Sequence, residues 1–192
     1  MVSDLDHDDN ACRKSRREKT YRFMRDRIAY MRDVVRSIEG LERKTEKHDH
    51  KKLCVRMNGS SDIAWESIKC ERDGVKHPNL MAAFPHIQFV DYTKKASRFD
   101  RALPANYHLT FSRSEINESD CVRLLERGVN VAVVFERKPL SWRGHVCIDG
   151  DEHDLRHLDA HAENGAAGYV VALTPKGRRA KADQSGFVVR SR

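Results

Sequence analysis

Short apolar runs recur from residue 53 onward, and their length restricts what the chain can fold into. Each run holds four to seven residues and is rich in Val, Ile, Tyr or Phe, a composition that favours strands over helices. The run VNVAVVF is apolar at almost every position, as in a strand buried on both faces. The runs lie at 53–58, 87–92, 107–111, 129–135, 145–149, 169–173 and 186–189.

Helical segments between some of these runs indicate a parallel arrangement. Residues 77–84 place Pro78 at a first-turn position, and residues 117–128 begin with capping residues and end at Gly128. A helix, a glycine and then a buried strand are typical of a βαβ unit. Beyond residue 140 the strands follow each other without obvious helices. We therefore predict an α/β fold with a mostly parallel sheet, an open or partial (β/α) barrel, and an antiparallel C-terminal addition.

The N-terminal quarter predicts one long helix over 17–39. Its apolar residues are three or four positions apart, which places them on one face. They are Tyr21, Met24, Ile28, Met31, Val35 and Ile38. Gly40 is a plausible end of this helix. We expect a flexible lead over 1–16, a charged connector over 40–52 and a sheet-forming part over 53–192, with 17–192 as a single α/β domain.

Charge and cysteine content narrow the functional classes. The chain has 36 Lys and Arg against 29 Asp and Glu, a net charge of +7. Its longest apolar run falls short of a membrane-spanning helix, and its first residues lack the apolar core of a secretory signal. We expect a cytoplasmic protein with no membrane partner. Five widely spaced cysteines argue against a disulfide framework and a local zinc knuckle, and we expect Cys54 and Cys147 to be buried thiols.

Polar residues follow four of the predicted strands. Because ligands of parallel α/β folds bind beyond the carboxyl ends of the strands, these residues are candidates for one small-ligand site. The candidates are Asn58, Asp62, Thr93, Lys94, Ser112 and Arg113, with Glu136 after the fourth strand. The alternative is that they are ordinary polar loop residues.

The segment 147–161 is dense in acidic residues and histidines. Asp149, Asp151 and Asp154 are of the type that binds hard cations. On a helix, three histidines at i, i+4 and i+8 would share one face and suit zinc or nickel; they are His153, His157 and His161. The favoured alternative is a charged turn, and we assign no metal and no other cofactor.

The C-terminal segment gathers four cations around Gly177. They are Lys176, Arg178, Arg179 and Lys181. A basic loop with a glycine suits phosphate, either of a small ligand or of a nucleic-acid backbone. It lacks the order of a P-loop, and a solvated loop is the alternative.

Several segments resemble the phage "gene product eighty-eight" family. They are VRMNGSSDIAWE, FPHIQFVDYTKKASR, PANYHLTFSRSEIN, GVNVAVVFE, the DGDEHDLRHLD stretch and the closing SGFVV, with the helix over 17–39. The resemblance covers the chain from about residue 15. It implies a phage-type protein of unassigned activity in the cytoplasm of a bacterial host.

More distantly, the layout is similar to part of the barrel of radical S-adenosylmethionine enzymes. That resemblance implies that Asn58, Asp62, Thr93, Lys94 and Ser112 lie along a substrate face. The family has a cysteine-rich stretch ahead of its long helix, where this chain has only Cys12. We therefore expect no iron–sulfur cluster, and either a naturally reduced chain or an internal start at Met1.

Three functions follow from these observations. The first is a phosphate-bearing or nucleotide-like small ligand at the strand ends, in a protein that is an enzyme only if missing parts are supplied. The second is sequence-independent binding of nucleic acid by the basic surface. The third is a protein-binding module.

Overall fold

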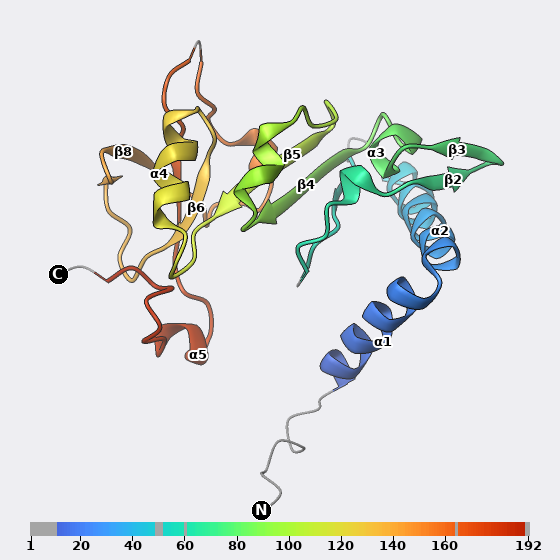
Figure 1. Cartoon of the computed structure of the whole chain (residues 1–192), viewed down its shortest axis with the longest axis horizontal. Helices are drawn as coiled ribbons and strands as arrows, with labels where there is room; N and C mark the ends of the chain where they lie inside the picture. Colours follow the sequence, from blue (N-terminus) through green and yellow to red (C-terminus); the bar gives the residue numbers. More distant parts are fainter. Residues whose placement is uncertain (1–10, 49–51, 60, 164, 191–192) are drawn as a thin grey trace, which may run out of the picture. The chain divides into compact units, whose positions relative to one another are not determined.

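The structure is a computed structural model that describes residues 11–48, 52–59, 61–163 and 165–190; of Cys12 and Arg179 it describes the backbone alone. The chain forms two compact units (Figure 1). Unit 1 comprises Met1–Leu53 and Ser67–Phe84, and unit 2 comprises Cys54–Glu66 and Pro85–Arg192. Within the described ranges, no helix is long and apolar enough to cross a bilayer.

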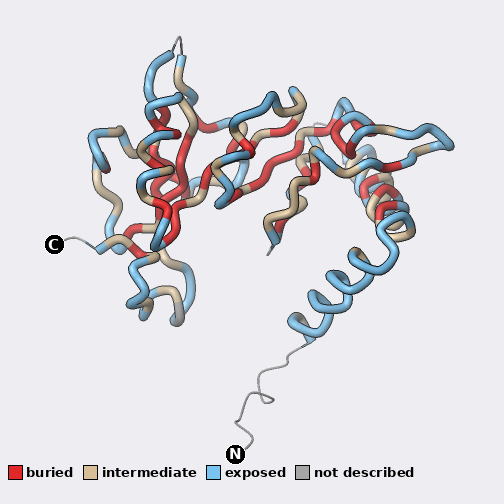
Figure 2. Tube along the Cα trace, viewed as in Figure 1, coloured by how far each residue is buried: buried red, intermediate tan, exposed pale blue. Residues whose placement is uncertain are grey.

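Unit 1 contains two helices where the sequence predicted one. α1 spans Ala11–Arg25 and α2 spans Arg27–Glu46. Asp26 separates them, because its carboxylate accepts a hydrogen bond from the Ala29 N–H at 2.9 Å and so caps the start of α2. α1 is largely exposed along its length (Figure 2), whereas α2 buries Met31, Val35 and Ile38.

The helix ends also differ from the predicted ones. α1 begins inside the expected lead, of which residues 1–10 lie outside the described part. Gly40 lies within α2 and does not end it, so the helix continues into the expected connector 40–52. A glycine can occupy a helix interior at a modest free-energy cost, and the packing of α2 outweighs that cost here.

A short antiparallel hairpin packs against α2. Strand β2 spans Cys70–Arg72 and strand β3 spans Val75–His77, joined by Asp73 and Gly74 with φ of 52° and 76°. Two positive φ values suit the Asp-Gly pair and the twist of a two-residue hairpin loop. The strands were missed because they are three residues long and half charged.

Arg72 links this hairpin to α2 through ion pairs. Its guanidinium lies 4.0 Å from the centroid of the Phe84 ring and forms ion pairs with Glu39 at 3.5 Å and Glu42 at 3.3 Å. The short helix α3, Leu80–Ala83, precedes Phe84. Its N-cap is Asn79, which accepts from the Ala82 N–H at 2.9 Å; the predicted helix placed Pro78 in this first turn.

Unit 2 is built on a seven-stranded sheet in the order β1-β4-β5-β6-β9-β8-β7. Neighbouring strands are parallel except β7 and β8. The first four follow the chain order, as predicted, and the two ends of the order do not pair, so the sheet is open. This confirms the mostly parallel, unclosed α/β sheet. The antiparallel addition is confined to β7, since β8 and β9 extend the parallel part.

Six of the seven predicted runs form strands of this sheet. They are β1 (Cys54–Arg56), β4 (Gln88–Thr93), β5 (Tyr107–Ser112), β6 (Val131–Val134), β8 (His145–Asp149) and β9 (Val170–Leu173). The seventh run, 186–189, makes one isolated parallel bridge, between Val189 and Phe135. Strand β7, Ser141–Trp142, was not predicted. Cys54 and Cys147 are partly exposed, contrary to expectation, because each lies near an edge of the sheet.

Helix α4, Glu118–Glu126, covers one face of the sheet, which we call the α4 face. Its buried side chains pack with Phe111 of β5 and with the same-facing residues of β6 and β9. Gly128 follows the helix with a φ of 82°, and its N–H donates to the Leu125 carbonyl at 3.0 Å. The core cluster comprises Phe111, Cys121, Leu124, Leu125, Val131, Val133, Phe135, Trp142, Val170 and Ala172.

The approach to β9 depends on a glycine without room for a side chain. A Cβ at Gly168 would lie 2.3 Å from the Val129 carbonyl oxygen, and the Gly168 N–H donates to the Leu125 carbonyl at 2.7 Å. We expect Gly168→Ala to lower the free energy of unfolding by about 2–3 kcal/mol, since the backbone itself must move. Urea unfolding followed by circular dichroism measures this effect.

The matched control is Gly40→Ala in α2, where a Cβ meets only the end of the Arg43 side chain at 3.9 Å. We expect this change to raise the stability by up to about 1 kcal/mol, the difference between Ala and Gly in a helix interior. Equal stability of Gly168→Ala and the parent chain would contradict the close backbone packing.

Candidate functional site

A cavity of about 330 Å³ lies at the carboxyl ends of β1, β4 and β5, and we call it the strand-end cavity. Its lining comprises Arg56, Asn58, Gly59, Ser61, Asp62, Tyr92, Thr93, Lys94 and Ser112. The structure thus brings five of the six proposed ligand-binding residues to one place. Arg113 is not among them. Ligand binding by these side chains stays a prediction.

Asn58 organises the loop beside the cavity. Its Nδ2 donates to the Ile63 carbonyl at 3.0 Å and to Asp91 Oδ2 at 3.1 Å. Its Oδ1 accepts from Ser61 Oγ at 2.8 Å, the Ile63 N–H at 3.0 Å and Trp65 Nε1 at 2.9 Å. Because the side-chain amide is buried and its bonding capacity is used, Asn58 positions the loop and has little capacity left for a ligand.

Asp62 is held by three donors. Its Oδ1 accepts from Thr93 Oγ1 at 2.8 Å and Arg98 Nη1 at 3.1 Å, and its Oδ2 accepts from the Lys94 N–H at 2.9 Å. Its negative charge is therefore balanced within the fold and joins the loop after β1 to the end of β4. Arg98 also donates from Nη2 to Glu66 Oε2 at 2.6 Å.

Three lining side chains keep free hydrogen-bonding capacity toward the cavity. The guanidinium of Arg56 lies 4.7 Å from the Tyr92 ring centroid, and Lys94 Nζ lies 5.2 Å from the Phe187 ring centroid. Among the described residues, neither cation has a carboxylate within ion-pair distance, and Ser112 Oγ has no hydrogen-bond partner. Two cations that form no ion pair, together with a hydroxyl group, suit an anion.

Comparison with known proteins shows which protein family the chain belongs to. Residues 9–191 match the family described as Gene product 88. The chain belongs to the Gene product 88 family. Searches of the curated proteins and of the solved structures returned no match. The comparisons therefore support a phage gene-product family and assign no activity to it.

Next to Asn58, this Gene product 88 protein buries a carboxylate. Asp91 is 1% exposed and accepts from the Asn58 N–H at 2.8 Å and from Tyr107 Oη at 3.0 Å. Burial raises the pKa of Asp91 to about 6, although both hydrogen bonds and the positive charge of Arg98 oppose the shift. Burial also raises the pKa of Tyr107. None of these groups except Asn58 lines the cavity.

On the face of the sheet opposite to helix α4, which we call the η4 face, two histidine rings are in contact. The 3-10 turn η4, Arg156–Leu158, packs against β5, and the rings of His108 and His161 lie 4.9 Å apart. Burial lowers the pKa of His108 to about 4, and the positive charges of His161, His157 and Arg156 lower it further. Because the segment forms a single turn, His153, His157 and His161 do not share a helix face.

Two of the acidic residues of 147–161 form ion pairs with one lysine. Lys138 Nζ lies 2.5 Å from Asp149 Oδ1 and 2.9 Å from Asp151 Oδ2, and Thr174 also donates to Asp151 through its hydroxyl at 2.7 Å. The described part of the chain contains no group of three or more His, Cys, Asp or Glu placed to hold a metal ion.

Arg113 serves the fold at another place. It follows Ser112 by one residue, so its side chain points to the opposite side of the sheet. Its Nη1 donates to the carbonyls of Gly186 at 2.7 Å and Phe187 at 2.9 Å, which anchors the C-terminal segment. It lines a separate cavity of about 690 Å³ with Glu118, to which it is ion-paired at 3.7 Å. Arg113 therefore does not line the strand-end cavity, and ligand binding by its side chain stays a prediction.

The basic C-terminal residues do not line the strand-end cavity. Arg178 and Lys181 are exposed on the short helix α5, Arg178–Lys181. Lys176 lies 3.6 Å from Asp151 Oδ1. The side chain of Arg179 lies outside the described residues.

Sequence reasoning missed Arg56, Tyr92 and Arg98. Arg56 and Tyr92 are polar interruptions of apolar strand runs, and the parallel register places them on one face. That alternation was visible in the sequence. Nothing in the sequence distinguishes Arg98 from the other exposed-looking arginines, because its burial comes from contacts with Asp62, Glu66 and Tyr107.

The two shifted groups predict opposing effects of pH on stability. Asp91 binds its proton more tightly when folded, so its stabilisation is present below pH 4 and is lost as the pH rises to about 6. His108 binds its proton less tightly when folded, so its stabilisation is present above pH 6.5 and is lost as the pH falls to about 4.

We expect Asp91→Asn to remove the first effect. Between pH 4 and 6 the stability of the parent chain should fall, relative to that of Asp91→Asn, by about 3 kcal/mol, the equivalent of roughly two pKa units. Urea unfolding at several pH values measures the difference, and Asp100→Asn, an exposed carboxylate, is the control. Parallel curves for Asp91→Asn and the parent would contradict the raised pKa.

Proposed function

We propose that this member of the Gene product 88 family binds a phosphate-bearing small ligand in the strand-end cavity. The observation that carries the proposal is the pair of cations, Arg56 and Lys94, which face the cavity without an ion-pair partner in the described part of the chain. The hydroxyl of Ser112 adds a neutral donor on the same rim.

The chemistry of these groups suits phosphate. A guanidinium donates two parallel hydrogen bonds to phosphate oxygens, and a lysine ammonium adds a point charge. Among the described lining residues, Asp62 is the only carboxylate, and three donors already compensate it. A volume of about 330 Å³ lies in the range of small-molecule sites. The ends of parallel strands are also the place where α/β folds bind ligands.

The proposal concerns binding rather than catalysis. Asp91, Tyr107, His108 and Cys121 are among the groups of unit 2 whose pKa is strongly shifted, and none of them lines the cavity. Of the lining residues, Tyr92 has its pKa raised by burial, which leaves its hydroxyl protonated at neutral pH. A general acid or base must lie within hydrogen-bond reach of the reacting atom. The described lining therefore supplies charge and orientation.

Titration calorimetry with pyrophosphate and ATP tests the site. We expect Lys94→Ala and Arg56→Ala each to weaken binding by about tenfold or more, because each removes a charge-assisted hydrogen bond worth roughly 1.5–3 kcal/mol. The matched control is Lys44→Ala, which removes a lysine exposed on α2. Adenosine, which lacks phosphate, should bind more weakly than ATP.

Two outcomes would contradict this proposal. One is unchanged binding in both variants. The other is a thermal shift with S-adenosylmethionine, which carries no phosphate, and none with pyrophosphate; that result would instead support the hypothesis of a radical S-adenosylmethionine-like barrel.

Nucleic-acid binding by the C-terminal segment is a second proposal. It is supported by the exposure of Arg178 and Lys181, which have no carboxylate partner among the described residues. Contacts from these cations to phosphate would be independent of sequence and sensitive to salt.

We expect the triple change of Arg178, Arg179 and Lys181 to Ala to flatten the log–log salt dependence of duplex DNA binding by roughly two to three units, if each side chain touches one phosphate. Mobility shift at several salt concentrations measures the slope. Changing Lys14, Arg16 and Lys19 of α1 to Ala is the control of equal charge. An unchanged slope in the C-terminal variant removes the second proposal.

A further inference from the structure

The apolar stripe of the N-terminal helices continues beyond the part that unit 1 buries. Met31 and Val35 are 3–4% exposed under the hairpin, whereas three residues of the same stripe toward the N-terminus remain in solvent. These are Tyr21 at 61%, Met24 at 70% and Ile28 at 76% exposure. Tyr21 and Met24 lie on α1, before the break at Asp26, whereas Ile28 lies on α2 and lines a cavity at the end of this row. Single exposed apolar residues are common, but one at the end of a cavity with an apolar floor indicates an interaction surface.

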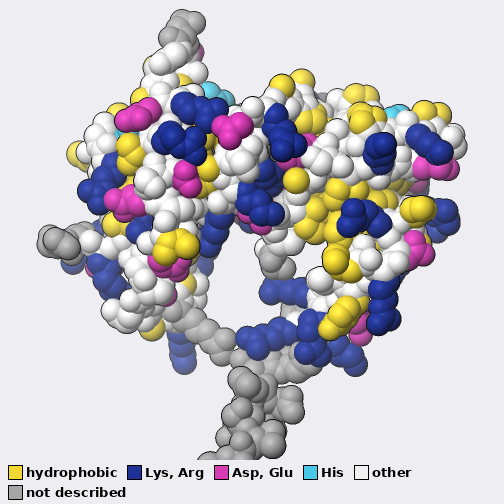
Figure 3. Space-filling model, in the orientation of Figure 1, with side chains coloured by type: hydrophobic (Ala, Val, Ile, Leu, Met, Phe, Trp, Pro, Cys, Tyr) yellow, Lys and Arg dark blue, Asp and Glu magenta, His cyan; other side chains and the backbone are white. Residues whose placement is uncertain are grey.

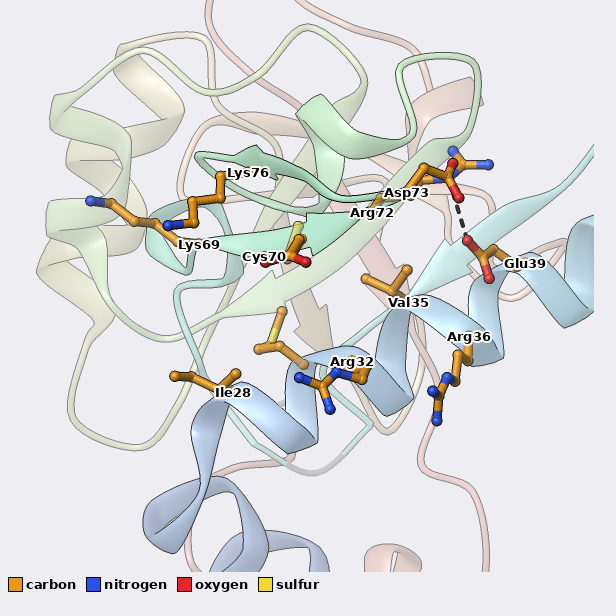
Figure 4. Close-up of a pocket in the computed structure, with 12 residues that line it drawn as sticks. Ile28, Arg32, Val35, Arg36, Glu39, Lys69, Cys70, Arg72, Asp73 and Lys76 are labelled. Atoms are coloured by element: carbon orange, nitrogen blue, oxygen red, sulfur yellow. Dashed lines mark ion pairs between the residues drawn. The ribbon is translucent and has the colours of Figure 1, made fainter.

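A groove of about 410 Å³ lies between α2 and the β2–β3 hairpin, at the end of this row. Val35 points from α2 toward the hairpin, and Ile28 lies at the end of the groove on the side of Lys69 (Figure 4); Cys70 of β2 also lines the groove. We call it the α2–hairpin groove. Its lining is mainly apolar in surface, and the whole groove belongs to unit 1.

The rim of the groove is basic. Arg72 is compensated by Glu39 at 3.5 Å and Asp73 at 3.7 Å. Three further cations of the rim have no carboxylate partner in the described part of the chain. Arg36 forms one ion pair there, with Asp33 at 3.8 Å, and Glu71 is the remaining anion of the rim. The three unpaired cations are Arg32, Lys69 and Lys76. Figure 3 shows hydrophobic side chains over α2 with Lys and Arg side chains beside them.

We propose that the α2–hairpin groove docks an acidic amphipathic helix of a partner protein. The lining runs along α2 from Ile28 to Glu39, which is about 17 Å or three helical turns. A helix lies in such a groove with apolar anchors at i, i+3 or i+4 and i+7. Carboxylates flanking the anchors face Arg32, Lys69 and Lys76, so the charge of the partner complements the rim.

The two other occupants fit the surface less well. A second copy would bring like charges together, because residues 11–46 carry 12 Lys and Arg against 6 Asp and Glu. A nucleic-acid backbone would match the rim but would leave Ile28 and the apolar floor against phosphate. Both are outcomes of the test.

Fluorescence anisotropy of a labelled peptide with the full chain tests the proposal. The probe is a 15-residue helix, about four turns, with Leu at the anchor positions and Glu elsewhere; its counterpart replaces every Glu by Lys. We expect the Glu peptide to bind, more weakly as salt rises, and the Lys peptide to bind at least about tenfold more weakly.

Two variants assign the binding to the groove. Ile28→Asp should weaken binding of the Glu peptide by about tenfold or more, because it places a carboxylate among the anchors. Its control is Ile116→Asp, the same change at a residue of unit 2 that is 93% exposed, which should leave binding unchanged. Because Ile28 is exposed, the variant is expected to fold, and circular dichroism checks this. Lys69→Glu with Lys76→Glu should weaken the Glu peptide and strengthen the Lys peptide.

Four results would overturn the proposal. They are no binding of the Glu peptide up to about 1 mM, equal binding of the Glu and Lys peptides, unchanged binding in a folded Ile28→Asp, and self-association of the parent that Ile28→Asp abolishes in sedimentation velocity. The last result would assign the groove to a second copy. Loss of duplex DNA binding in the double lysine variant, without peptide binding to the parent, would assign it to nucleic acid.

Discussion

The buried guanidinium of Arg98 holds the candidate ligand site together. It is 5% exposed and donates to Asp62 at 3.1 Å, to Glu66 at 3.0 and 2.6 Å and to Tyr107 Oη at 3.0 Å. Asp62 and Glu66 come from the loop after β1, and Tyr107 comes from β5, so one cation joins segments that are distant in the chain. Since a buried carboxylate without its partner is strongly destabilising, the loop depends on this arginine for its position.

The Arg98 cluster also explains the charge of the strand-end cavity. Because Asp62 is compensated from inside the fold, its carboxylate does not neutralise Arg56 or Lys94. The cavity therefore keeps a positive lining beside a carboxylate, which is the basis of the phosphate proposal. The α2–hairpin groove of unit 1 has a different chemistry, an apolar floor with a basic rim. The two surfaces call for different partners, and each is tested by its own variants.

Much of the sheet followed from local pattern. Runs such as 129–135 are too short and too apolar for surface helices, and α4 with Gly128 between two such runs requires a crossover, hence parallel neighbours. The pattern failed where local sequence was ambiguous. Asp26 caps a second helix inside an apparently continuous stripe, and the β2–β3 hairpin has alternating charges that hide its strands.

For the site, the sequence by itself determined which strand ends carry polar residues, because parallel strands place all their carboxyl ends on one edge. Only the tertiary structure decided the role of each residue. Asn58 and Asp62 are consumed by hydrogen bonds from residues up to 36 positions away, and Arg113 turns to the other side of the sheet to hold the C-terminal segment. Arg56 and Lys94 remain available because the described fold brings no carboxylate within ion-pair distance of them. The local pattern predicts at which strand end a side chain lies. The burial of that side chain and its hydrogen-bond partners depend on contacts between distant segments, which no local pattern encodes.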